Sequence, residues 1–452
     1  MPSRRAFLRT LGAVGVTPIA GLTSAQTEQS AAPAVSWTRT YGESAEYAGV
    51  EDVVAAEDGY YLIGTARHEY PMYRGLVIRV DTAGHKQWQQ EVALSSTILN
   101  AGSPHPRGGV MVTGVTNLSE PNYSEDTPLS SDPFLARITD EGTLEWTRTL
   151  QPTAGAGRLS AVSQTNGGYL VGGSKQARKD TPEKLWAAYI SNAGHQQWSS
   201  TLAKEDQKGT LNAVSADGDV WYVGGSVAPA QSDDYGRSEN AIITCLNRDG
   251  TVQWRYEHDE LNGSRIESLH TTANGVVGVG NRGFAVDNDG EGWHFQLTTD
   301  GDVEWTQSHT TGPWNWLQDS VALDGSYLLV GTREEESEED NGPRGAWVLK
   351  TGPTGDRRWE TTYFDGESSS GRTVQRHSEG GFVIGGRTDV DSTTAGWLLN
   401  VGGSEADQPS ITSDPLSNVT NALPPETGAV ASGAVIGGTA VALGQRLLSD
   451  DG

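Results

Sequence analysis

The chain has little cysteine and little positive charge. Cys245 is the one cysteine among 452 residues, so the chain can form neither an internal disulfide nor a cluster of thiolate metal ligands. Lysine and arginine together number 32 against 58 acidic residues, which leaves a formal net charge of -26. A surface this acidic repels phosphate backbones and anionic lipids, so we expect no nucleic-acid partner and no electrostatic binding to a membrane surface.

Hydrophobic residues are also scarce, at 35% of the chain, and so polar a composition occurs in disordered proteins. The regular spacing of the tryptophans, described below, argues against disorder. The basic residues comprise 25 arginines and only 7 lysines, and this bias, together with the acidity, resembles proteins of salt-loving archaea. In molar salt the Debye length is about 3 Å, so we interpret the acidity as adaptation to a saline solvent.

The first residues resemble a targeting signal. Arg4 and Arg5 precede a weakly apolar run at 11–20 and a small-residue site near Ala25. This pattern resembles a twin-arginine signal peptide spanning residues 1–25, with an ordinary short helix as the alternative. We therefore expect export by the twin-arginine route, to the extracellular space or the cell surface.

The last residues suggest a tether. Residues 405–427 are rich in serine, threonine and proline, which predicts a flexible stalk. Residues 428–446 are rich in glycine and alanine and are short for a membrane span, which needs about 20 apolar residues. We interpret them either as a C-terminal membrane anchor or as a disordered tail. The preceding segment 423–428 resembles a sortase-like processing site.

Tryptophans recur along the chain at intervals of 51 to 58 residues, which indicates an array of repeats. From the second repeat onward, a glycine precedes each tryptophan by four residues, as a tight turn entering a strand requires. The tryptophans are Trp37, Trp88, Trp146, Trp198, Trp254, Trp305 and Trp359.

Each repeat also contains a short β-branched and aromatic run that ends in glycine, as in residues 169–173, and this run occurs seven times. With two further apolar runs, each repeat holds four short strands, which is typical of a β-propeller blade. The sequence therefore predicts an all-β chain: a seven-bladed β-propeller of four-stranded antiparallel blades over residues 35–404. An open solenoid is the alternative.

The ends of the array support a closed ring. The last repeat ends at residues 397–400 without a fourth strand, whereas residues 35–40 form a strand with no repeat of their own. We predict that this N-terminal strand completes the last blade and so removes an exposed sheet edge.

The Gly-x-x-x-Trp element resembles the tryptophan-docking repeat of the quinoprotein, or PQQ-type, β-propellers over residues 35–404. Only the glycine and the tryptophan match, because the family's threonine is present once, at Thr354, and its aspartate is missing from every copy. The quinoprotein enzymes have eight blades and usually a vicinal disulfide, which one cysteine excludes. The resemblance therefore implies the fold and the packing between blades in a non-catalytic member, and it weakens the case for a quinone cofactor.

Aligning the first strands of the repeats places one polar residue per blade at one register around the central channel. Its carboxylates are the oxygen ligands that a hard cation such as calcium requires; apart from calcium we expect no cofactor. The alternative, which we favour, is a hydrated channel whose polar groups bridge blades through water, with Arg372 paired to Asp319 and Asp52. The ring comprises Asp52, Asn100, Ser160, Asn212, Glu267, Asp319 and Arg372.

Aromatic residues gather in the long loops of the sixth, seventh and first repeats, and these loops share one face of the predicted propeller. Exposed aromatic side chains stack on sugar rings and anchor protein partners. Packing between blades is the alternative for any single one of them. The cluster comprises Tyr41, Tyr47, Tyr70, Tyr73, Trp314, Trp316, Tyr363 and Phe364.

No catalytic motif accompanies this scaffold in the sequence. We therefore expect a monomeric, non-enzymatic binding or scaffold module that takes a glycan or a cell-envelope protein on its long-loop face. One alternative is an enzyme working in the channel, either a divergent quinoprotein-like dehydrogenase or a metal-assisted lyase or hydrolase. Another is an architectural component of the cell envelope.

Overall fold

The computed structural model describes residues 32–402, apart from 43, 70–71, 93–94, 119–130, 151–155, 178–180, 233–237, 259–262, 284–289, 313, 338–341, 379 and 392. The predicted signal peptide (1–25), stalk (405–427) and anchor (428–446) lie outside the described residues. Within the described ranges, no helix has the length and hydropathy that crossing a bilayer requires.

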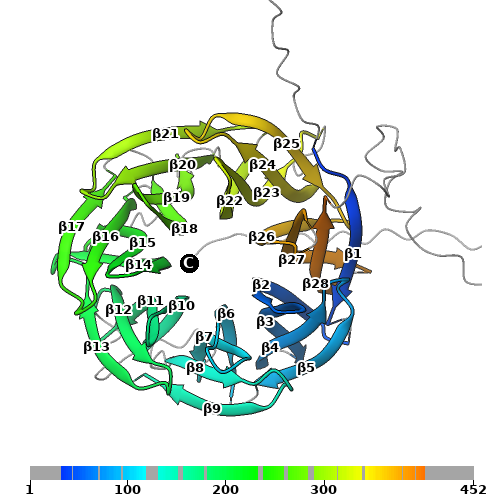
Figure 1. The fold of residues 1–452 in the computed structure, drawn as a ribbon, viewed down its shortest axis with the longest axis horizontal. Coiled ribbons are helices and arrows are strands. Elements are labelled where there is room, and N and C mark those ends of the chain that lie inside the picture. The colour runs from blue at the N-terminus through cyan, green and yellow to red at the C-terminus, as the bar shows by residue number, and fades with distance from the viewer. Residues whose placement is uncertain are drawn as a thin grey trace, which may run out of the picture. The chain divides into compact units, whose positions relative to one another are not determined.

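The described residues form antiparallel sheets whose strands follow chain order from the centre outward (Figure 1). The innermost strands are β2 (Tyr47–Ala56), β6 (Ile98–Pro104), β10 (Ala156–Thr165), β14 (Gln207–Asp217), β18 (Ser264–Thr272), β22 (Trp314–Leu323) and β26 (Ser369–Arg376). The second strands are β3 (Gly59–Glu69), β7 (Val110–Thr116), β11 (Gly168–Gln176), β15 (Val220–Pro229), β19 (Gly275–Arg282), β23 (Ser326–Glu334) and β27 (Phe382–Val390). The third strands are β4 (Met72–Asp81), β8 (Asp132–Ile138), β12 (Lys184–Ser191), β16 (Asn240–Asn247), β20 (Glu291–Thr298), β24 (Arg344–Thr351) and β28 (Thr393–Val401). The outer strands are β1 (Val35–Tyr41), β5 (Lys86–Val92), β9 (Leu144–Thr149), β13 (Gln196–Thr201), β17 (Val252–Glu257), β21 (Val303–His309) and β25 (Arg357–Tyr363).

Five of the sheets have four strands each, β6–β9, β10–β13, β14–β17, β18–β21 and β22–β25. The remaining sheet has eight strands, in two antiparallel runs joined by one parallel pair between Tyr47 of β2 and Thr394 of β28. The innermost strands contact one another in the order β2, β6, β10, β14, β18, β22, β26 and back to β2. For the described residues, the expected all-β fold with repeated four-stranded antiparallel sheets is confirmed, and its architecture is that of a β-propeller.

The N-terminal strand closes the array as predicted. β1 pairs antiparallel with β28, and Thr40 lies opposite Trp397. The indole nitrogen of Trp397 donates to the hydroxyl of Thr38 at 2.7 Å. The outer edge of β28 is therefore covered by the start of the chain.

The hydrophobic core lies between consecutive sheets. All the residues of β7 are buried, because sheets cover both of its faces, and this explains its continuous apolar run. Val110 and Val112 of β7 share one cluster with Tyr61 and Ile63 of β3.

Every innermost strand carries a β-bulge at the same place. In β14, Leu211 pairs with Gly225 and Ala213 with Gly224, so Asn212 is the extra residue. A Cβ at Gly225 would lie 2.0 Å from the carbonyl oxygen of Thr210, so no side chain fits there. This close approach explains the glycine at the end of each second-strand run. The equivalent glycines are Gly64, Gly114, Gly173, Gly225, Gly280, Gly331 and Gly386.

The turn glycines receive tryptophans from the neighbouring sheet. Gly142 has a φ of 81°, and a Cβ there would lie 2.9 Å from the ring of Trp88. Trp88 Nε1 also donates to the carbonyl of Asp140 at 2.7 Å. Five tryptophans therefore dock on the following sheet, and Trp37 docks within the eight-stranded sheet. From Trp88 onward, the glycine four residues before each tryptophan comes from the tryptophan's own repeat. The docked pairs are Trp37 with Gly84, Trp88 with Gly142, Trp146 with Gly194, Trp198 with Gly250, Trp254 with Gly301 and Trp305 with Gly355.

Candidate functional site

The predicted polar ring occupies the bulges of the innermost strands, with two corrections. In β2 the bulged residue is Glu51 and in β22 it is Gln318, whereas Asp52 and Asp319 come one residue later. The expectation of one register for all members of the ring was therefore wrong at these two positions. The other members, at the bulges of β6, β10, β14, β18 and β26, are Asn100, Ser160, Asn212, Glu267 and Arg372.

Asp52 and Asp319 connect neighbouring innermost strands. Asp52 Oδ2 accepts from the backbone N–H of Gly102 at 2.8 Å, and Asp319 Oδ2 accepts from that of Val374 at 3.0 Å. Burial raises the pKa of Asp52 to about 6. Both carboxylates therefore act as direct links between consecutive sheets.

The amide side chains of the ring make the same kind of link. Asn100 Nδ2 donates to the carbonyl of Leu159 at 2.7 Å, and Asn212 Nδ2 donates to that of Ile266 at 3.0 Å. These bonds link neighbouring innermost strands directly, and bridging through water stays a prediction.

Arg372 has partners other than the expected ones. Its Nε lies 3.9 Å from Glu51 Oε2, and its Nη1 donates to Gln318 Oε1 at 3.1 Å. The predicted pairing of Arg372 with Asp52 and Asp319 was wrong, because those two carboxylates are one residue past the bulge and accept backbone N–H groups. Among the described residues, no group of three or more His, Cys, Asp or Glu side chains could hold a metal ion. Calcium binding stays a prediction.

Trp314 and Trp316 stand together at the start of β22. Their rings are stacked, with centroids 6.1 Å apart and an angle of 13° between the planes. The guanidinium of Arg344 lies 5.0 Å from the centroid of Trp314, within range of a cation–π contact. Trp316 donates to the carboxyl of Glu267, whose pKa burial raises to about 7. Trp316 is thus tied to the channel wall.

Tyr47 and Tyr73 flank one arginine. The guanidinium of Arg67 lies 5.9 Å from the centroid of Tyr47 and 5.7 Å from that of Tyr73. The guanidinium of Arg387 also lies near Tyr47, 5.5 Å from its ring centroid.

The remaining aromatic residues of the predicted cluster pack inside the fold. Tyr41 is buried and its hydroxyl donates to the carbonyl of Gly84 at 2.7 Å. Tyr363 donates to the carbonyl of Pro33 at 2.5 Å, and half-buried Phe364 packs on Gly345. Tyr41 and Tyr363 thus make contacts that fix the N-terminal segment, and Phe364 packs within the sheet β22–β25. Tyr70 lies outside the described residues.

Tyr47 and Trp314 line the same cavity, although they belong to strands far apart in the chain. We call it the long-loop cleft, and its volume is about 260 Å3. Hydroxyl and guanidinium groups surround the two aromatic rings. The lining residues are Tyr47, Trp314, Thr332, Arg344, Ser368, Ser369, Ser370, Arg372, Arg387, Asp389 and Thr394.

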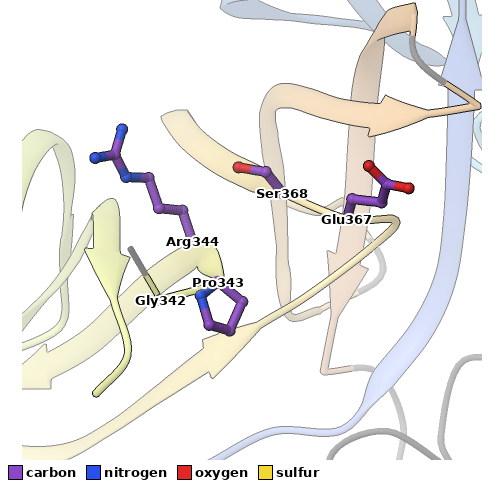
Figure 2. A pocket seen from close by; sticks show the side chains of 5 residues that line it. All are labelled: Gly342, Pro343, Arg344, Glu367 and Ser368. Carbon is purple, nitrogen blue, oxygen red and sulfur yellow. The ribbon is translucent and has the colours of Figure 1, made fainter. Parts of the chain in front are cut away.

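A wider, more open hollow of about 500 Å3 adjoins the long-loop cleft and shares Arg344 and Ser368 with it. Figure 2 shows the hydroxyl of Ser368 directed toward the side where Arg344 stands, and the carboxylate of Glu367 directed away from it. The two hollows meet at these polar side chains, so a ligand longer than one ring could extend from one into the other.

The sequence predicted the aromatic walls of the cleft and missed most of its polar groups. Arg344 begins β24, Arg387 lies near the end of β27, and Ser368 immediately precedes β26. Arg344 and Ser368 stand where strands meet the long loops, and that position was the signal that could have found them. Arg387 lies inside β27, which only two residues separate from β28, so its position gave no such signal.

The described residues form a β-propeller with a cavity lined by aromatic and polar side chains. No family model and no curated protein matches the chain. Solved structures that match it include chains with 7 to 12% identity and TM-scores of 0.39 to 0.48.

Among them are Drosophila Plexin A in complex with Semaphorin 1b, with 7% identity, a TM-score of 0.46 and coverage of 82% of this chain and 87% of that chain. Polysaccharide lyase Uly1 has 9% identity and a TM-score of 0.48, with coverage of 78% and 90%. Puromycin hydrolase, as its S511A mutant complexed with PGG, has 11% identity and a TM-score of 0.48, with coverage of 77% and 51%.

Proposed function

We propose that the chain is an exported or cell-surface β-propeller of seven blades that binds a carbohydrate without catalysis. In this proposal the eight-stranded sheet counts as two blades, β2–β5 and β26–β28 with β1, which touch at the single pair Tyr47–Thr394. The bulge and its facing glycine recur once in each of these blades, as in the four-stranded sheets. Export rests on the N-terminal sequence pattern, and fractionation of expressing cells tests it.

The observation that carries the binding function is the convergence of Tyr47 and Trp314 on the long-loop cleft. Both side chains are only partly buried, so part of each ring remains open to a ligand. Sugar rings carry an apolar face that packs on aromatic side chains, and hydroxyl groups around their edge that need hydrogen-bond partners.

The polar lining of the cleft supplies such partners. Ser370 and Thr394 carry hydroxyls that both donate and accept, and Arg387 carries a planar set of donors. Ser370 lies on the innermost strand β26, Arg387 on β27 and Thr394 on β28, so neighbouring strands of one sheet hold these groups in place and the cleft is largely formed before the ligand arrives.

Binding of a glycan array by the exported form, followed by calorimetry with the bound glycans, tests the proposal. Trp314→Ala and Tyr47→Ala should each weaken binding at least about 10-fold, since stacked aromatic side chains dominate such contacts. Tyr73→Ala is the matched control, because Tyr73 touches Arg67 and does not line the cleft.

Equal binding by Trp314→Ala and the unmodified protein would contradict the proposal. Binding of a cell-envelope protein with no glycan bound would assign the face to the protein partner instead. Circular dichroism and melting temperature confirm that each variant is folded.

A further inference from the structure

We propose that the sugar bound in the long-loop cleft is acidic, and that Arg372 and Arg387 bind its carboxylate. This inference rests on the proposed carbohydrate-binding function and names the class of ligand.

The first argument is the local reversal of charge. Acidic residues outnumber basic ones by 58 to 32 in the whole chain. The lining of the long-loop cleft has the opposite balance, with Arg344, Arg372 and Arg387 against Asp389. A cationic cavity on an anionic surface draws small anions inward, since the field is focused where basic groups line a hollow.

The second argument is the pairing of the two arginines. Arg387 Nη2 lies 2.8 Å from Glu51 Oε1, and Arg372 Nε lies 3.9 Å from Glu51 Oε2. Two guanidinium groups thus share the carboxylate of Glu51. The buried carboxyl of Glu267 also lies near enough to Arg372 to feel its charge, but burial raises the pKa of that carboxyl to about 7, which favours its neutral form. The Nε atoms of both arginines are buried and have no hydrogen-bond partner among the described residues.

The other carboxylates near the cleft are already engaged. Asp389 Oδ1 accepts from the hydroxyl of Thr394 at 2.8 Å. Glu334 Oε2 accepts from Nε of Arg344 at 3.0 Å. A second carboxylate arriving on a ligand would therefore meet Arg372 and Arg387, where donors outnumber acceptors, and a planar guanidinium matches a carboxylate well.

The third argument is the position of the arginines relative to the aromatic rings. Arg387 covers Tyr47 at 5.5 Å and Arg344 covers Trp314 at 5.0 Å, each measured from the guanidinium carbon to the ring centroid. A sugar whose carboxylate reaches Arg387 would lie beside Tyr47. The charged group and the ring of one hexuronate residue can thus be bound together.

Calorimetry with matched oligosaccharides tests the inference. Oligogalacturonate and oligomannuronate are each compared with their methyl esters, which keep the ring and hydroxyls but lack the charge. We expect at least one acid form to bind about 10-fold or more tightly than its ester, since charge-assisted hydrogen bonds are about twice as strong as neutral ones. Arg372→Gln and Arg387→Gln should abolish this preference.

The control variant is Arg248→Gln. Arg248 is exposed and lies in the turn between β16 and β17, where it pairs with Asp219 at 3.1 Å. This change removes the same charge from the protein without touching the cleft, so the preference for the acid form should persist.

Three results would overturn the inference. Equal binding of acids and esters, still lost in Trp314→Ala, would leave a neutral-sugar site and spare the proposed function. Binding of dextran sulfate, but of neither uronate nor unmodified dextran, would assign the anion as a sulfate ester. Failure to bind any sugar, acidic or neutral, would overturn the carbohydrate-binding function as well.

Discussion

His309 should make the protein sensitive to mild acid. It ends β21 with only 4% of its surface exposed, and its Nε2 has no hydrogen-bond partner among the described residues. Burial, which has the larger effect, and the positive charge of Arg357 lower the pKa of His309 to about 4. An unfolded histidine has a pKa of about 6.5.

These two pKa values decide the direction in which the free energy of unfolding changes with pH. Between pH 6.5 and about 4 the unfolded chain takes up a proton at this residue and the folded chain does not. The free energy of unfolding therefore falls as the pH falls through this window, by about 1.4 kcal/mol per pH unit, or about 3 kcal/mol in all. Above pH 6.5 His309 is neutral in both states, so none of this stability is lost.

Other buried groups act over the same range. Burial lowers the pKa of His294 well below its usual value, which adds to the loss in acid. Burial raises the pKa of Asp52 to about 6 and that of Glu267 to about 7, and these carboxyls favour the folded state as the pH falls. A variant at His309 separates its titration from that of the two carboxyls; it also removes the contribution, smaller than that of burial, that the charge of His309 makes to the lowered pKa of His294.

Urea unfolding of the unmodified protein and of His309→Gln at pH 7.0 to 4.5 provides the measurement, with exposed His195→Gln as the control. The difference in unfolding free energy between the two proteins should shrink by about 1.4 kcal/mol for each unit below pH 6.5. A difference that stays constant from pH 7.0 to 4.5 would show that His309 is not held neutral by the fold.

Two further predictions concern the packing around the glycines of β15 and the burial of the Cys245 thiol. Gly225→Ala should lower the free energy of unfolding by more than the ~3 kcal/mol typical of overpacking, because its Cβ would meet a backbone oxygen at 2.0 Å. In Gly224→Ala the added Cβ would meet only side-chain atoms, at 2.9 Å, so the free energy of unfolding should fall by about 1–3 kcal/mol. Equal losses for the two variants in denaturant titrations would refute the explanation that the bulge requires glycine at residue 225. Burial raises the pKa of the Cys245 thiol to about 11, so iodoacetamide should label it at neutral pH only after unfolding, and fast labelling of the folded protein, read by mass spectrometry, would contradict this.

Much of the fold could be predicted because it depends on local, repeated features. The apolar run of residues 169–173 predicts a buried strand by its composition alone, and β11 is found there. The surplus strand at residues 35–40 predicted the closure, and β1 pairs with β28.

The register of the bulge could not be predicted from such local features. Glu51 and Asp52 are both polar, and so are Gln318 and Asp319, so alternation of polar and apolar residues cannot say which member of each pair is extra. The choice depends on hydrogen bonds to the neighbouring sheet, such as that from Gly102 to Asp52.

The candidate site could likewise be predicted only in part from the sequence. The sequence indicated the aromatic cluster, but it could not separate Tyr47, which lines the long-loop cleft, from Tyr41, which packs against Gly84. That distinction depends on which neighbouring sheet covers each ring. Arg387 was missed because nothing near it in the chain marks it as a partner of Tyr47.

The sequence by itself determined the repeat, the strand order and the need for glycine in the turns, because backbone conformation and apolar periodicity act over a few residues. Only the tertiary structure decided that Tyr47, Trp314 and Arg387 share one cavity and that Arg372 faces Glu51. These contacts join strands that are far apart in the chain, and the packing of one sheet on the next brings them within reach.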